Sequence, residues 1–415
     1  MKIKSSLVLS TIIVMTTVSA AFADNSIAEN IENGDINSIS RNEQELSSII
    51  NNYSDSFGGL YFEQETNTYH VIPYANAVNT YDLDNGMDKV DNIDLDIVYD
   101  TPAKYSYKEL QDASDELGTE EVMSDLEITS VGVDVIGNGL FVGAAEWTED
   151  KKQAVRDVTE IENITFEIFS GVPDEENEEN SNEAETLSTM RNVVNEARYG
   201  SYLFNSNGGS SSLGGMVSYD NDDDSLLFIT AGHGGNEGDN ISIELPTSPA
   251  TVGEIVDVKM GGSVDAALIE VENSSLAVSS YTINLNEYPE EIPVIMASGA
   301  PIVGKTCRIY GRNSQVYVTI EDVDRNISWN DPSNDDVGYY TDMIKMSPVG
   351  SQTAQPGDSG AGVIMIDFGG DGVPSYGTVS GIYKGRSSDG ALIASRWDSV
   401  VEEFGVGFKS VNWIK

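Results

Sequence analysis

The strongest constraint on the fold comes from residues 196–415, where short apolar runs alternate with clusters of Gly, Asn, Asp and Ser. Such runs, bounded by turn-forming residues, are typical of antiparallel strands, and a series of them predicts a β-sandwich or β-barrels. The 39 glycines of the chain agree with a turn-rich β structure. Strands are expected over 225–231, 266–271, 316–320, 362–366 and 376–382, and one helix over 397–404.

The preceding part of the chain has a different pattern. Helices are expected over 43–52, 107–123 and 149–160, and hairpins around 58–72 and 128–143. The second hairpin turns at Gly137-Asn138-Gly139, a strong signal for a tight turn. We therefore predict an α+β domain over 24–172, joined to a β-rich domain over 196–415. Residues 173–195 are mostly acidic and polar, which predicts a solvated linker.

The first 23 residues are typical of an export signal. Lys2 and Lys4 precede an apolar run over 7–18, and Ala21-Phe22-Ala23 forms a small-residue cleavage pattern. A membrane anchor is the alternative, but spanning a bilayer takes about 20 apolar residues and this run is shorter. The mature protein is therefore expected outside the cell. Cys307 is the only cysteine, so no internal disulfide can form, and we expect a buried thiol.

The charge excludes some partners. The chain has 22 Lys and Arg against 69 Asp and Glu, a net charge of -47. Binding to nucleic acids or to anionic membranes needs basic patches, so neither is expected. No metal or other cofactor is indicated, because the acidic runs 220–224 and 367–372 lack the spacing of a calcium loop. They predict solvated turns, and His70 is expected to be structural.

Three motifs carry possible chemistry. His233 follows an apolar run, and Asp265 opens another, where a buried carboxylate could orient an imidazole. Ser359 lies within Gly357-Asp358-Ser359-Gly360, where glycines allow a sharp turn that exposes the hydroxyl. Each motif alone also fits an ordinary structural residue or turn. Their order along a β-rich domain that has only one histidine predicts a His–Asp–Ser catalytic triad.

The chain resembles the bacterial chymotrypsin-like serine proteases of the streptogrisin and α-lytic protease group. The matching segments are Thr230-Ala231-Gly232-His233, Asp265-Ala266-Ala267-Leu268 and 354–360, and around them Ser211-Ser212-Leu213-Gly214 and Thr378-Val379-Ser380-Gly381. Residues 57–61 and 128–134 are similar to that family's propeptide, which assists folding, inhibits the enzyme and is then removed. The resemblance implies two antiparallel six-stranded β-barrels of the trypsin type after an α+β propeptide.

The resemblance also implies roles for other residues. The N–H groups of Gly357 and Ser359 would form the oxyanion hole, Ser380 would donate to Asp265, and Arg308 would neutralise the buried Asp358. The substrate pocket would be lined by Ala354, Gln355, Val379, Gly381 and Ile382. With no acid or histidine in this set, and Ile382 where open pockets have glycine, small or medium apolar side chains are expected before the scissile bond.

The departures from the family concern cysteine. Ser211, Gly234 and Thr353 stand where relatives have disulfide cysteines, and Ser211 and Gly234 would be the two halves of one bridge. No triad member is missing, which favours an active enzyme over a silent homologue. With the resemblance, we expect a monomeric, self-processing endopeptidase that is inhibited by its own propeptide and acts on peptides and proteins. Two alternatives stay open: a catalytically silent secreted binding protein, and a secreted serine esterase.

Overall fold

Strand pairing among the described residues forms three sheets and one small two-stranded ladder. The computed structural model describes residues 36–77, 80–171, 195–205, 208–219, 222–282, 292–297, 301–331, 336–368 and 374–411. The expected export signal over 1–23, most of the expected linker (residues 173–194) and the acidic turns expected around 220–221 and 369–373 lie outside the described residues. The described residues from Ser40 onward form one compact unit.

The N-terminal region, residues 40–171, has an α+β pattern. Its first part is a three-stranded sheet with two helices: α2 (Ile36–Asn52), β1 (Phe57–Glu63), β2 (Thr68–Pro73), α3 (Thr80–Val90) and β3 (Ile97–Tyr99). Its second part contains α4 (Tyr107–Leu117), α5 (Glu120–Asp125), β4 (Ser130–Asp134), β5 (Gly139–Ala144), α6 (Glu149–Val158) and β6 (Ile164–Ile168).

The helix expected over 107–123 is two helices. Ser106 and Glu109 form a capping box at the start of α4, which ends at Gly118. Thr119 then accepts a hydrogen bond from the N–H of Val122 and caps α5. A new cap therefore starts a second helix where the apolar pattern alone suggests continuity.

The C-terminal region, residues 195–411, begins with a curled eight-stranded sheet in the order β23-β10-β11-β14-β13-β12-β8-β9. Its strands are β8 (Tyr202–Asn205), β9 (Ser210–Ser212), β10 (Gly215–Tyr219), β11 (Asp222–Thr230), β12 (Asn240–Ile243), β13 (Ala250–Gly261), β14 (Val264–Val271) and β23 (Val406–Phe408). Two short strands, β7 (Ala197–Tyr199) and β15 (Val278–Thr282), pair in parallel beside it. Buried side chains from β10, β11 and β14 fill its core.

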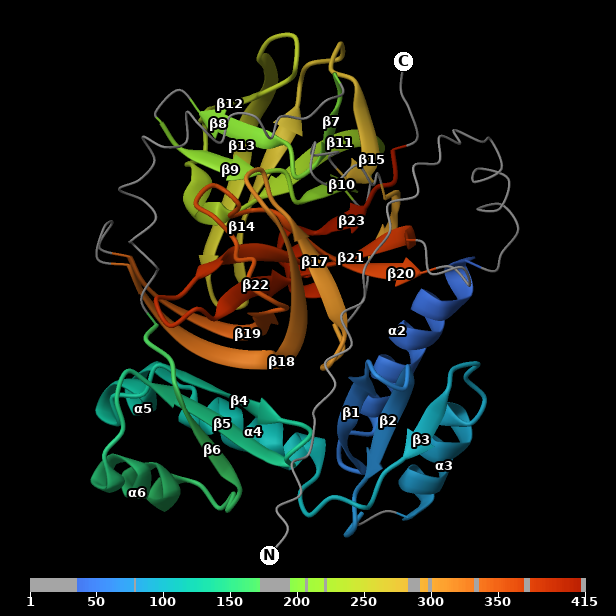
Figure 1. Ribbon diagram of the computed structural model, residues 1–415, viewed down its shortest axis with the longest axis vertical. Coiled ribbons are helices and arrows are strands. Elements are labelled where there is room, and N and C mark those ends of the chain that lie inside the picture. The colour runs from blue at the N-terminus through green and yellow to red at the C-terminus, as the bar shows by residue number, and fades with distance from the viewer. Residues whose placement is uncertain are drawn as a thin grey trace, which may run out of the picture. The chain divides into compact units, whose positions relative to one another are not determined.

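A second set of six strands closes into a barrel, because β17 pairs with both β18 and β20. These strands are β17 (Thr306–Tyr310), β18 (Gln315–Asp331), β19 (Asp336–Pro348), β20 (Gly362–Phe368), β21 (Pro374–Arg386) and β22 (Leu392–Arg396), with β16 (Val294–Ala297) beside β21. Helix α8 (Trp397–Phe404) has the bounds expected from the sequence. Figure 1 shows β18 and β19 curving together along one side of this barrel.

The expected two-barrel architecture is therefore confirmed, with one barrel closed and the other an open, curled sheet. Strand β18 is 17 residues long, far beyond the 316–320 expected, because its outer part extends past the barrel with β19. There Asn326 and Ile327 pair with Val131 and Ser130 of β4. The sheet thus continues from the closed barrel into β4, β5 and β6.

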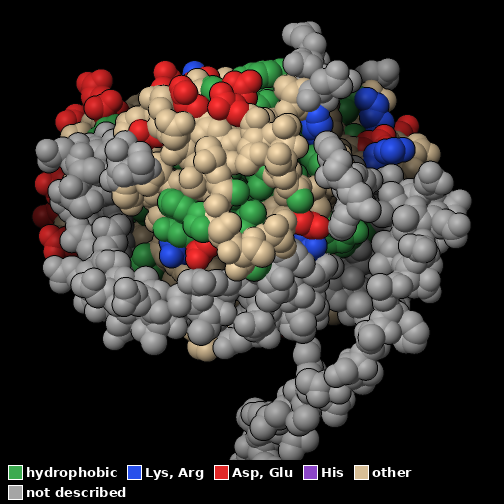
Figure 2. All heavy atoms as spheres, turned by 90° about the horizontal axis from the view of Figure 1, so that it is seen from above, with side chains coloured by type: hydrophobic (Ala, Val, Ile, Leu, Met, Phe, Trp, Pro, Cys, Tyr) green, Lys and Arg blue, Asp and Glu red, His purple; other side chains and the backbone are tan. Residues whose placement is uncertain are grey.

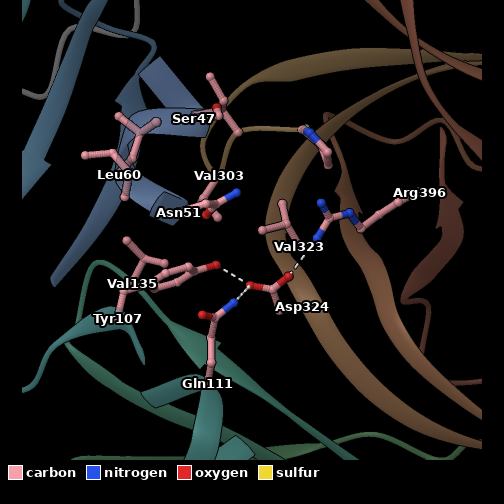
Figure 3. A pocket seen from close by; sticks show the side chains of 13 residues that line it. Ser47, Asn51, Leu60, Tyr107, Gln111, Val135, Val303, Val323, Asp324 and Arg396 are labelled. Atoms are coloured by element: carbon pink, nitrogen blue, oxygen red, sulfur yellow. Dashed lines mark hydrogen bonds and ion pairs between the residues drawn. The ribbon is translucent and has the colours of Figure 1, made fainter. Parts of the chain in front are cut away.

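Polar and charged side chains line the junction between α4 of the N-terminal region and β18. Tyr107 and Gln111 of α4 bond to Asp324 of β18, which pairs with Arg396 at 2.8 Å. Figure 3 shows these side chains meeting beside a cavity of ≈ 60 Å³. Acidic side chains also lie in groups along the face seen in Figure 2, as the net charge of -47 leads one to expect.

Candidate functional site

His233 and Asp265 lie together at the ends of two paired strands. β11 ends at Thr230, opposite Ala267 of β14, and His233 follows in the 3₁₀ turn η3 (Gly232–Gly234). Nδ1 of His233 lies 3.0 Å from Oδ2 of Asp265. The His233 side chain is 31% exposed and that of Asp265 is fully buried. The imidazole is thus held on its Nδ1 side by a buried carboxylate.

Asp265 accepts more bonds than the one from the imidazole. The N–H groups of Gly232 and His233 donate to Oδ1 at 2.8 and 3.2 Å. The ammonium of Lys384 pairs with Oδ2. Burial raises the pKa of Asp265, but the neighbouring Lys384 and His233 bring it well below the ordinary value. The carboxylate is therefore ionised over the whole physiological range.

Ser359 is presented by a loop of the second barrel. The next residue, Gly360, has a φ of +85° and packs so closely that a Cβ would lie 2.3 Å from Oγ1 of Thr230. Only glycine fits this contact, which joins the serine loop to the end of β11. Ser359 Oγ donates to the carbonyl oxygen of Lys384 at 2.9 Å. The structure thus brings Ser359 beside the segment that carries His233, without a hydrogen bond between the two side chains.

The N–H groups expected to form an oxyanion hole lie on the same loop. Gly357 has a φ of +87°, and its carbonyl accepts a bond from Ser212 Oγ at 2.9 Å. Among the described residues, no acceptor takes the N–H of Gly357 or of Ser359. Such N–H groups could stabilise negative charge that develops on a substrate oxygen.

The expected partner of Asp358 is wrong. Asp358 is fully buried, and its carboxylate accepts bonds from the N–H groups of Asn313, Ser314 and Gln355 and from the hydroxyl of Ser314. Arg308 is not among its partners; its guanidinium lies over Tyr310 and Tyr317 instead. Burial raises the pKa of Asp358 to about 6, although all four bonds favour the carboxylate. The β17–β18 turn, and not an arginine, holds the serine loop.

Ser314→Ala is expected to slow modification of Ser359 by a fluorophosphonate by about tenfold. A hydrogen bond to a charged group contributes about 1.5–3 kcal/mol, and its loss should loosen the loop that presents Ser359. Labelling rates followed by mass spectrometry would measure the effect. Ser347→Ala on β19 is the matched control, and equal rates in both variants would refute the role of Ser314.

The expected role of Ser380 is also wrong. Its hydroxyl is buried and has no hydrogen-bond partner among the described residues. The group that meets Asp265 is Lys384, four residues further along β21, whose carbonyl also meets Ser359. The segment beside the serine is therefore Lys384-Gly385-Arg386. In the sequence, the signal for this segment is a lysine that interrupts an apolar strand. Such a lysine fits a buried ion pair and an exposed end of a strand equally well.

The expected pocket lining is wrong for most of its members. Val379 and Ile382 belong to the core of the first sheet, and Ala354 to that of the closed barrel. A Cβ on Gly381 would lie 2.5 Å from the carbonyl oxygen of Ser395, so it faces backbone. Of the expected lining residues, Gln355 is partly exposed, and its side chain donates to the carbonyl oxygen of Thr353 at 3.2 Å. The expectation of an apolar pocket loses its basis.

Ser211 and Gly234, two positions where relatives have disulfide cysteines, lie next to each other in the structure. A Cβ on Gly234 would lie 3.2 Å from the Cβ of Ser211, slightly closer than the about 3.5–4.5 Å of a disulfide, so the two positions are adjacent. Ser211 Oγ now accepts a bond from Thr230 at 2.7 Å. Cys307 is fully buried, as expected.

In the N-terminal region His70 bonds Asp100 at 2.9 Å and stacks on Tyr61, a structural setting.

No group of three or more His, Cys, Asp or Glu side chains in the described part of the chain is arranged to hold a metal ion. No helix in the described ranges combines the length and the apolar character needed to cross a bilayer.

The two barrels, with His233 and Asp265 on one and Ser359 on the other, give the chain a trypsin-like fold. No family model and no curated protein matches the sequence. Solved structures similar to it include Thermobifida fusca Protease A, Nocardiopsis Protease and Cellulomonas bogoriensis chymotrypsin. Each is 18% identical to this chain. The match covers 52% of this chain and 100% of each of the three, with TM-scores of 0.40, 0.40 and 0.39.

Proposed function

We propose that residues 196–415 form a secreted serine endopeptidase, made as a self-processing precursor with a signal over 1–23 and a propeptide over 24–172. The observation that carries this proposal is the bond from His233 to the buried Asp265, on a segment in contact with the loop of Ser359. That combination supplies a base, its orienting carboxylate and a nucleophile at one place.

The reaction would follow from these positions. Since Nδ1 of His233 faces Asp265, Nε2 is the nitrogen that can take the proton of Ser359. Ser359 Oγ would turn from the Lys384 carbonyl and attack the scissile carbonyl carbon, and the N–H groups of Gly357 and Ser359 would bind the oxyanion. His233 would then protonate the leaving amine, and water would hydrolyse the acyl-enzyme.

The contacts of the N-terminal region support its role as a propeptide. Besides the β4–β18 pairing, Arg325 of β18 pairs with Asp322 at 3.0 Å and with Glu167 of the N-terminal region at 2.9 Å. Lys345 of β19 also pairs with Glu167, at 2.7 Å. The β18–β19 hairpin thus has charged and backbone partners on the proposed propeptide, which supports a role for that segment as a folding assistant.

The two alternatives predict different results with the same purified protein. A fluorophosphonate that reacts with Ser359 would exclude a silent binding protein. Matched peptide and ester substrates would then separate a peptidase from an esterase, because an esterase hydrolyses the ester alone at a useful rate. Absence of both labelling and peptide hydrolysis in a folded, processed chain would refute the proposal.

We propose that Arg386 influences which substrate side chain is preferred before the scissile bond. Its guanidinium donates to Oγ1 of Thr353 at 2.6 Å, joining the strand beside Ser359 Oγ to the segment that leads into the serine loop. The residue before the scissile bond would lie beside Ser359, and we propose that the strand that carries Arg386 brings this positive charge toward it. We expect peptides with Glu or Asp at this position to be cleaved at least about tenfold faster than those with Ala or Val.

A peptide series that varies this one residue tests the preference, with Arg386→Gln as the partner variant. The variant should lose the preference for acidic residues while keeping part of the activity on apolar ones. Faster cleavage after Ala or Val by the wild type would refute the acidic preference and restore the apolar one.

A further inference from the structure

Asp265 has a charged partner besides His233. Lys384 Nζ pairs with Oδ2, the same oxygen that lies 3.0 Å from Nδ1 of His233. The Lys384 side chain is 4% exposed. A neutral hydroxyl would satisfy a carboxylate lone pair at a much smaller desolvation cost than an ammonium. A buried cation at this point therefore needs an explanation beyond hydrogen-bond satisfaction.

The ammonium is held firmly in place. It donates to the hydroxyl of Tyr340 at 3.1 Å and lies 4.2 Å from the centre of that ring. The ring of Trp329 lies on another side, with its centre 5.3 Å from Nζ. Burial lowers the pKa of Lys384, but Asp265 and Tyr340 raise it above the ordinary value. Lys384 is thus a permanent positive charge fixed by two aromatic residues of the β18–β19 hairpin.

We propose that Lys384 is a positioning residue that acts through Asp265, holding the carboxylate ionised and aimed at His233 by a fixed charge. This inference rests on the proposed hydrolytic function. When Ser359 transfers its proton, Asp265 has to balance two cations, the imidazolium and the ammonium. The protonated histidine is then stabilised less than it would be by Asp265 alone, so the enzyme should keep its reactive neutral imidazole to lower pH.

The other charged groups around the cluster do not replace this effect. The elements packed on Asp265 contribute His233 from η3, Lys384 from β21 and the titratable Tyr340 from β19. Ser395 of β22 accepts from the Asp265 N–H at 2.8 Å and carries no charge. On the adjacent β13, Lys259 is directed to Asp257 and Glu403, at 3.9 and 3.7 Å.

The test compares the pH dependence of kcat/KM for wild type, Lys384→Met and Lys384→Gln, all expressed as the full chain and allowed to mature. Removing the cation should move the acid limb of the profile to higher pH by about one unit, the lower end of the range for a close charge. The Lys384→Gln variant keeps a neutral hydrogen-bond donor, so its profile should shift in the same direction. Lys259→Met, which removes a partly exposed lysine of β13, should leave the profile unchanged.

The outcomes are separable. A shift in either variant, with circular dichroism like that of the wild type, supports the proposal. An acid limb that coincides with that of the wild type in both folded variants overturns it, whatever happens to the maximal rate. Failure of both variants to fold or mature would show a structural role and also overturn it. A wild type without Ser359-dependent hydrolysis refutes the proposed function, and this inference with it.

Discussion

Ser359→Ala is expected to leave the chain whole where the wild type shortens. Expressed as residues 24–415, the wild type should yield a fragment of about 220 residues, corresponding to the proposed mature enzyme. Without the nucleophile no acyl-enzyme forms, and kcat on peptides should fall by about 10⁴–10⁶-fold. Mass spectrometry of both proteins over time measures the chain length and locates the new terminus.

Ser351→Ala is the matched control, because Ser351 is an exposed serine that precedes the same loop. It should mature like the wild type. If the Ser359→Ala chain is cut at the same bond and rate as the wild type, self-processing through Ser359 is refuted. The cut bond also tests the substrate preference: the linker over 173–195 contains seven acidic residues, and cleavage after one of them agrees with a role for Arg386.

Asp265→Asn should have the second largest effect. An amide at this position can present its NH₂ group to His233 and so hold the wrong tautomer, and we expect kcat to fall by about 10⁴-fold. The same substitution removes the counter-ion of the buried Lys384. Breaking a buried ion pair costs about 3–5 kcal/mol, so the variant should also unfold at lower denaturant concentration.

Asp257→Asn separates these effects from a general loss of charge. Asp257 lies on the neighbouring strand β13, is partly exposed and has Lys259 3.9 Å away. Its replacement should change neither rate nor stability by a measurable amount. Full activity in a folded Asp265→Asn variant would remove Asp265 from the mechanism.

Short-range patterns predicted much of this molecule correctly. The hairpin over 128–143 turns at Asn138, the helix at 397–404 has its expected bounds, and His233 and Asp265 end adjacent strands. In each case the information is local: a turn dipeptide, a periodic apolar face, or a polar residue that follows or opens an apolar run.

Long-range contacts account for the errors. Ser380 and Lys384 lie four residues apart on β21, and it is Lys384, within a register shift of the β21–β22 pairing, that meets Asp265. Apart from Gln355, the partners of Asp358 are Asn313 and Ser314, from a turn about 45 residues earlier in the chain, which no spacing rule connects to Ser359. The same holds for β18, whose outer part pairs with β19 out to Asp331 and there also meets β4 of the N-terminal region.

The continuity of the sheet from β18 into β4 would have a consequence for the mature enzyme proposed above. Loss of the N-terminal region would turn the outer half of β18 into an open sheet edge, with unpaired N–H and C=O groups that could recruit another chain. Asp322, Asp324 and Arg325 stand on that half of the strand and are buried at the junction. Once hydrated, these charged side chains would oppose pairing of the edge with another chain, since charges along a sheet edge oppose aggregation. The buried charges that are costly in the precursor would thus keep the released enzyme soluble.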